Sequence, residues 1–110
     1  MCELDAAFEA LADGRRRTAI ACLQEHRELT LADLAELIAE CERGRCVQAI
    51  DDEAVRDIYL SLYHDHVPKL EAADVAQYAQ ERDCVATTDR TETVLSAARE
   101  NVATLAGPEC

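Results

Sequence analysis

The chain has 110 residues, of which 49% are hydrophobic and 31% are charged. This length fits one domain around a single modest core, and the composition excludes a disordered chain. No apolar run approaches the roughly 18 residues of a membrane span. Residues 1–11 lack the basic start and the continuous apolar stretch of a signal peptide. We therefore expect a cytoplasmic protein.

The chain is strongly acidic, with 23 acidic residues against 11 basic ones and a formal net charge of -12. Lys69 is its one lysine, so arginine supplies nearly all the positive charge. Solubility alone would explain an acid excess that is spread over a folded domain. The scarcity of lysine favours a second explanation, a salt-rich cytoplasm in which a carboxylate-covered surface stays hydrated.

Helical patterns fill the first half of the chain. One helix is expected over about 4–12, where apolar residues recur at helical spacing at Leu4, Ala7, Phe8 and Leu11. Asp13 and Gly14 end it. A second helix is expected over about 15–26, with a buried side formed by Ala19, Ile20, Cys22 and Leu23.

A brief extended link, "ELT", separates the second helix from a third. Thr30 is followed three residues later by Asp33, which resembles a capping box with a shorter acid. The third helix is expected over about 31–42, ending near Gly44. Its apolar positions follow the spacing of a buried face and are Leu31, Leu34, Ala35, Ile38 and Cys41.

A fourth helix begins after three carboxylates, at Asp51, Asp52 and Glu53, where the positive end of a helix dipole favours them. Its buried side is expected at Val55, Ile58, Tyr59 and Leu62. Pro68 should kink this helix or begin a new turn, because proline lacks the N–H and its ring disfavours a helix interior.

A β-hairpin and a last helix complete the chain. "VAQYAQ" and "CVATT" predict two short strands joined by "ERD". Asp89 and Glu92 then cap a helix over about 90–106. Its apolar seam has spacings of 4, 3, 4 and 3 and consists of Thr91, Leu95, Ala98, Val102 and Leu105. The seam either joins two subunits or packs on its own domain, and we favour the dimer.

Two stretches give this order of elements a specific resemblance. "ALADGRRRTAIACLQEH", Ala10 to His26, resembles the opening helices of ArsR-like regulators. "HVPKLEAADVAQY", His66 to Tyr78, resembles the end of their recognition helix and their first wing strand. The pattern is most similar to small winged-helix proteins of halophilic archaea, which share a segment like "SLYHDHVPKL". The resemblance spans about residues 4–88, and residues 90–106 follow as a C-terminal helix.

The resemblance implies a mainly α-helical winged helix-turn-helix domain, with an extra helix at each end and the hairpin as its wing. It further implies a sequence-specific transcription regulator, usually a homodimer, that binds double-stranded DNA through the helix before the wing. Asp74 stands where the family usually has glycine, so we expect an aspartate with unusual backbone angles at the turn into the wing.

Candidate DNA contacts are cationic, aromatic or imidazole groups, which grip phosphate or read base edges. They are Arg15, Arg16, Arg17, Arg43, Arg45, Arg56, Tyr59, Tyr63, His64, Lys69 and Arg82. Residues 51–66 hold five acids against one arginine, which should repel a duplex in dilute buffer. In molar salt the Debye length falls to about 3 Å, so that only charges at contact distance matter.

Other chemistry has less support in the sequence. Cys41 and Cys46 with His64 or His66 would be a metal site, but there is no CxxC pair, so we expect neither metal nor any other cofactor. We expect reduced thiols, with a redox switch at Cys2, Cys46 or Cys110 left open. No phosphate loop or nucleophile motif points to an enzyme. The rival function is a protein-interaction module that keeps the fold without binding DNA.

Overall fold

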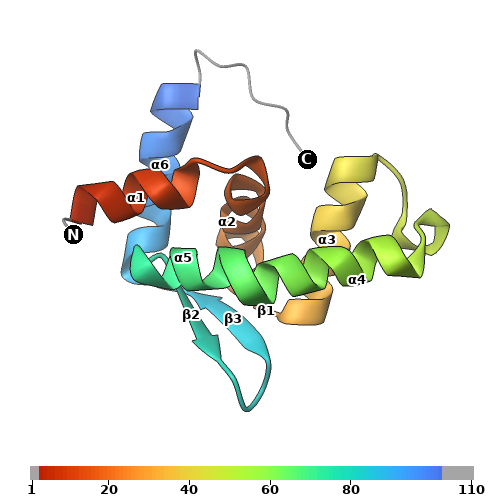
Figure 1. The fold of residues 1–110 in the computed structure, drawn as a ribbon. Coiled ribbons are helices and arrows are strands. Elements are labelled where there is room, and N and C mark those ends of the chain that lie inside the picture. Colours follow the sequence, from red (N-terminus) through yellow and green to blue (C-terminus); the bar gives the residue numbers. More distant parts are fainter. Residues whose placement is uncertain (1–2, 103–110) are drawn as a thin grey trace.

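The computed structural model describes the backbone of residues 3–102 and the side chains of residues 6–94 and 96. This part of the chain is mainly helical with a small antiparallel sheet (Figure 1). The helices are α1 (Glu3–Leu11), α2 (Gly14–His26), α3 (Leu31–Arg43), α4 (Asp52–Ser61), α5 (Val67–Ala72) and α6 (Asp89–Val102). The strands are β1 (Glu28–Thr30), β2 (Ala76–Ala79) and β3 (Cys84–Thr87). A 3-10 turn, η1 (Val47–Ala49), precedes α4.

Side-chain and glycine caps set the ends of α2 and α3. Gly14 was expected to end the first helix, but it is the first residue of α2. The Asp13 carboxylate accepts hydrogen bonds from the backbone N–H of Arg15 and Arg16, at 2.8 and 3.4 Å, and so begins α2. The Thr30 hydroxyl accepts from the Asp33 N–H at 3.0 Å and begins α3. Gly44 ends α3 with a φ of 66°, which glycine adopts without strain.

The fourth predicted helix is a continuous rod with a π-helical turn, η2 (Leu62–His66), between α4 and α5. Pro68 lies in the first turn of α5, as predicted for a proline that begins a new turn. The Val67 N–H bonds to the Leu62 carbonyl, five residues back. The π turn was not predicted from the sequence. It shifts the hydrogen-bond register of the helix just before Pro68, the residue that has no N–H.

The three strands pair in the order β1-β3-β2, all antiparallel. The predicted hairpin is therefore confirmed, and the link at residues 28–30 adds a third strand to it. Leu29 lies opposite Val85 in β1 and β3, and Tyr78 lies opposite Val85 from the other side. Asp74 has a φ of 59°, in the left-handed region expected for it.

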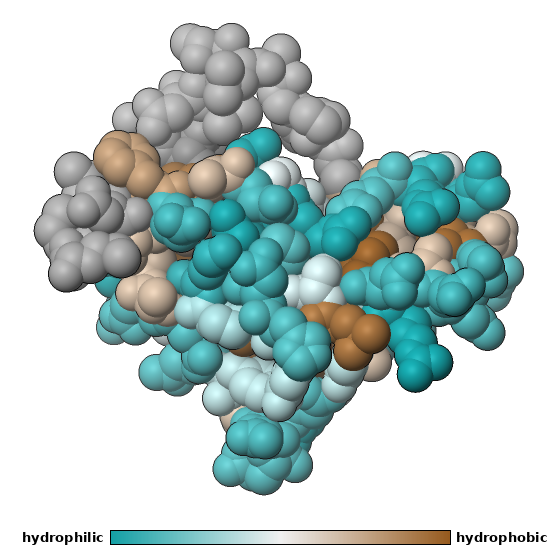
Figure 2. Space-filling model, viewed as in Figure 1, coloured by the Kyte–Doolittle hydropathy of each residue, from teal (hydrophilic) through white to brown (hydrophobic). Residues whose placement is uncertain are grey.

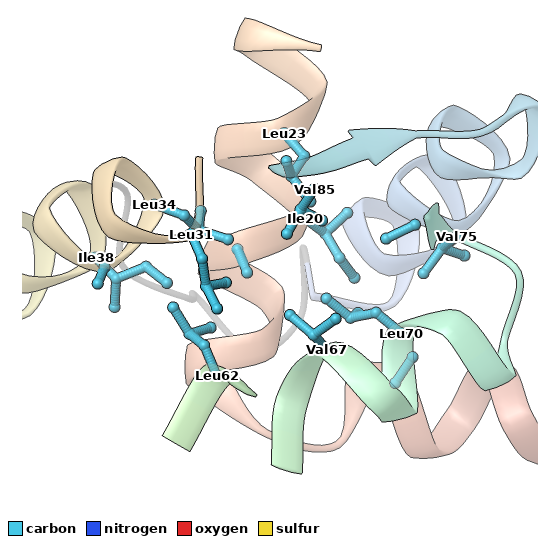
Figure 3. Packing of buried hydrophobic residues seen from close by; sticks show 14 of the residues in the cluster. Ile20, Leu23, Leu31, Leu34, Ile38, Leu62, Val67, Leu70, Val75 and Val85 are labelled. Carbon is cyan, nitrogen blue, oxygen red and sulfur yellow. The ribbon is translucent and has the colours of Figure 1, made fainter. Parts of the chain in front are cut away.

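The core is formed where α2, α3, the α4–α5 rod and the sheet meet (Figure 3). Its largest fully buried side chains include Ile20, Leu23, Leu31, Leu34, Ile38, Leu62, Leu70, Val75 and Val85. α1 buries Ala6 and Ala10, whereas Phe8 is 58% exposed, so the inward face of this helix is the alanine side.

α6 packs on the domain through its first turns. Thr91 and Val94 are buried, and the Thr91 hydroxyl donates to the Val75 carbonyl at 2.7 Å while it accepts from the Thr88 N–H at 2.8 Å. The prediction that Thr91 belongs to a dimer seam is therefore wrong, because its hydroxyl caps the helix inside its own domain. The side chains of Leu95, Ala98 and Val102, and all of Leu105, lie outside the described residues.

Candidate nucleic-acid interface

The α4–η2 rod presents one face to solvent beside the hairpin (Figure 1). Its exposed side chains on that face are Glu53, Arg56, Asp57, Leu60, Tyr63 and His64. Leu60 is 42% exposed and Tyr63 is 40% exposed, although both are large and apolar or aromatic. The surrounding surface is mostly hydrophilic, with separate hydrophobic residues showing through it (Figure 2). This face is open, and carboxylates do not cover all of it.

Asp83 fixes the hairpin to α4. Its carboxylate accepts a hydrogen bond from the Tyr59 hydroxyl at 2.7 Å, and its second oxygen accepts one from the Tyr78 hydroxyl of β2. The Asp83 carbonyl accepts from the Leu31 N–H at 2.8 Å, at the start of α3. Asp83 has a φ of 51°, a conformation that aspartate tolerates better than most residues. One turn residue thus joins β2, α3 and α4.

Hydrogen bonding to Asp83 raises the pKa of both tyrosines that contact it, because the carboxylate disfavours a neighbouring phenolate. Tyr63 completes an aromatic cluster. Its ring packs edge-on against His64, with centroids 5.0 Å apart, and against Tyr78, with centroids 6.1 Å apart. Tyr59 was predicted as a DNA contact, but its hydroxyl donates a hydrogen bond to Asp83.

Two of the three consecutive α2 arginines hold helices together at the surface. The Arg15 guanidinium donates to both Glu42 carboxylate oxygens, at 2.7 and 2.8 Å, and to the Ser61 hydroxyl at 3.0 Å. It therefore ties α2 to α3 and α4. Arg17 donates to the Leu11 carbonyl at 2.6 Å and caps the end of α1. A phosphate contact by either would compete with these bonds.

Arg16 is buried, which removes it from the candidate DNA contacts. Its guanidinium donates to the Ala10 and Glu9 carbonyls, at 3.3 and 2.9 Å, and lies 3.1 Å from the Nδ1 atom of His66. Burial lowers the pKa of His66, so its imidazole is neutral at pH 7 and accepts the Arg16 N–H. Asp65 lies 3.9 Å from the same guanidinium. This cluster joins α1, α2 and the π turn.

The remaining cations divide into paired and open groups. Lys69 lies 2.7 Å from Asp65, and Arg82 of the hairpin turn lies 3.0 Å from Glu28 of β1. Arg43, Arg45 and Arg56 are exposed, and no ion pair joins them to another residue in the described part of the chain. Arg43 is the last residue of α3, and Arg45 lies in the link between α3 and η1.

The two histidines of the π turn point to different sides, since His64 is exposed and His66 is buried. Among residues with described side chains, no group of three cysteine, histidine or acidic side chains is placed to hold a metal ion. Cys22, Cys46 and Cys84 carry free thiols, whereas Cys41 is disulfide-bonded, contrary to the expected reduced state. None of the helices in the described range is long and apolar enough to cross a bilayer.

A family model described as a domain of unknown function, DUF7344, matches residues 8–86. The chain belongs to the DUF7344 family. The matched region of this DUF7344 protein begins within α1 and ends within β3, so it contains the α4 face and the hairpin. No curated protein and no solved structure matches the chain.

Proposed function

We propose that this DUF7344 protein is a winged helix-turn-helix transcription regulator that binds double-stranded DNA as a homodimer in a high-salt cytoplasm. The order α2-β1-α3-α4-β2-β3, with β3 at the centre of the sheet, supports this assignment. In such a domain α3 and α4 form the helix-turn-helix pair, α4 enters the major groove, and the β2–β3 hairpin is the wing.

The observation that carries the proposal is the open α4 face next to a hairpin that Asp83 holds in place. Tyr63, His64 and Arg56 on this face carry hydroxyl, imidazole and guanidinium groups, which bind base edges and phosphates. Arg82 reaches from the hairpin turn, with its side chain 63% exposed.

The carboxylates of the same face set the conditions for binding. Glu53 and Asp57 are exposed on α4 and repel phosphates in dilute buffer. At about 2 M salt the Debye length is about 2–3 Å, so this repulsion falls away at groove distances. The same salt weakens the gain from counterion release, so hydrogen bonds and apolar contacts must supply the affinity.

A binding titration tests the proposal. Labelled genomic fragments are titrated with protein in about 0.15 M and about 2 M KCl, and selective binding is expected at the higher salt. Tyr63→Ala should weaken the selected complex about fivefold to 100-fold, as expected for a lost base contact. Phe8→Ala removes another exposed aromatic ring, on α1, and should leave affinity unchanged. Absence of selection at both salt concentrations rejects DNA binding.

One observation favours a second function, a protein-interaction module. The guanidinium groups of the three consecutive α2 arginines make hydrogen bonds within the domain. Leu60 and Tyr63 instead remain exposed among acidic residues. Exposed large side chains of this kind are common in protein interfaces. If the α4 face served this function, Leu60→Ala and Tyr63→Ala would weaken binding to a partner protein, and the titration above would show no selected DNA.

A further inference from the structure

Two shallow grooves lie on either side of the outer face of α3, and Glu36 lines both. The first lies between α3 and α4, with a volume of about 250 Å³. Ala32 and Ala35 of α3 and Val55 of α4 give it an apolar floor, which η1 extends with Val47.

The second groove runs between α3 and Leu29 of β1, also with a volume of about 250 Å³. Leu29 and Leu37 form its apolar floor, and both are half-buried. Asp33, Glu36 and Glu40 form its rim. The Glu40 carboxylate also accepts the Val47 N–H at 2.8 Å, which holds η1 against the end of α3.

The charge around the two grooves is strongly one-sided. Four carboxylates line them, from Asp33, Glu36, Glu40 and Asp52, against one guanidinium, from Arg56. A phosphate backbone would be repelled here at contact distance. An apolar floor with an acidic rim instead complements a protein segment that has aliphatic side chains next to lysine or arginine.

We propose that these two grooves, the α3 docking surface, bind an amphipathic basic segment of a partner protein. The segment places aliphatic side chains on the floors and its cations against Glu36, Asp33 and Asp52. Glu36 is central because it borders both grooves. In high salt the apolar contacts hold the segment in place. Ion pairs between the groove carboxylates and the cations of the segment select a basic sequence over a neutral one.

Docking also regulates DNA binding, a consequence that rests on the proposed function. Arg56 and Tyr59 line the first groove and belong to α4, the proposed groove-reading helix. A segment seated there covers Arg56, so partner and DNA bind this protein competitively. By thermodynamic linkage each ligand weakens the other by the same factor.

The test uses the full chain and a labelled synthetic peptide, without DNA. The peptide has about 14 residues, roughly four helical turns, with leucine and alanine on one face and arginine on the other. A second peptide has the same composition in scrambled order. Fluorescence anisotropy in about 0.15 M and about 2 M KCl should show saturable binding of the amphipathic peptide only.

Two protein variants locate the site. Glu36→Lys should weaken peptide binding about tenfold or more, because it places a like charge against the bound cations. Glu25→Lys makes the same charge change at an exposed position of α2, outside both grooves, and should have little effect. If Glu36→Lys does not fold, as judged by circular dichroism, Ala32→Arg serves instead, since it fills the first groove from an exposed position.

Four outcomes would overturn the proposal: no binding of the amphipathic peptide, equal binding of the scrambled peptide, equal loss in both lysine variants, or a doubled mass that Glu36→Lys abolishes. The last would mean that a second copy of this chain occupies the grooves. Because DNA is absent, failure here leaves DNA binding untouched. Failure of the DNA titration likewise leaves the peptide result standing.

Discussion

The Asp83 cluster gives the most quantitative prediction. Asp83→Gly removes the acceptor of two tyrosine hydroxyls but keeps a residue that adopts the left-handed backbone of this turn. A hydrogen bond to a charged group contributes about 1.5–3 kcal/mol, and partial exposure reduces this to about 1 kcal/mol for each bond here. The entropy cost of glycine, about 0.5–1 kcal/mol, is offset by relief of the strained φ. We therefore expect a loss of about 2 kcal/mol in the free energy of unfolding.

Asp83→Asn is the matched variant. It keeps the shape, the left-handed preference and one acceptor oxygen, so it should lose about 1 kcal/mol, since neutral bonds are roughly half as strong as charge-assisted ones. Urea unfolding followed by circular dichroism measures both values. A free energy of unfolding of Asp83→Gly within about 0.5 kcal/mol of the wild type, a difference typical of an unimportant surface site, would refute this role of Asp83.

Tyrosine absorbance gives a second measure of the same cluster. The chain has three tyrosines and no tryptophan, so its phenolate signal comes from Tyr59, Tyr63 and Tyr78. Asp83 raises the pKa of Tyr59 and Tyr78, so these two should ionise later in the wild type than in Asp83→Gly. Because the folded pKa exceeds the unfolded value of about 10, this stabilisation is complete below that pH and is lost as pH rises above it. Unchanged ionisation in the variant would contradict the assignment.

Three further predictions concern the buried cluster and the terminal helix. Arg16→Met should lower the free energy of unfolding by about 3 kcal/mol, because it leaves His66 and two carbonyls without a donor. A urea melt measures this loss, and a loss below about 1 kcal/mol would contradict the structural role of Arg16. The free energy of unfolding should fall as pH drops below about 6.5, because His66 takes up a proton in the unfolded chain more readily than in its buried site. Urea melts at two pH values test this, and the pH dependence of the free energy of unfolding should be weaker in His66→Gln. Leu95→Glu and Val102→Glu should convert the proposed dimer into a monomer by light scattering, and a wild type that is already monomeric would remove the dimer.

Most of the element order was predictable because its signals are local. Asp13, Thr30 and Gly44 act within a few residues of their own positions, so the sequence places the ends of α2 and α3 well. The hairpin was predictable for the same reason. The third strand, at residues 28–30, was not, because its pairing with β3 joins positions more than 50 residues apart.

The candidate site was less predictable because it depends on distant contacts. Three consecutive arginines point in three directions around a helix, about 100° apart, so one of them faces inward. The local sequence does not show which one. Arg16 is that residue only because Ala10 and His66 meet it there. Tyr59 fits the apolar side of α4 in the sequence, and its bond to Asp83 spans 24 residues.

The central claim is that DNA lies on the α4 face, and ring-proton NMR in about 2 M KCl tests it most directly. The chain has three histidines and three tyrosines, so their ring signals are few enough to assign by single substitutions. Addition of a selected duplex should shift the signals of His64 and Tyr63, while buried His66 and His26 at the end of α2 stay in place. Shifts confined to His26, or no shift in any of these rings, would contradict the account.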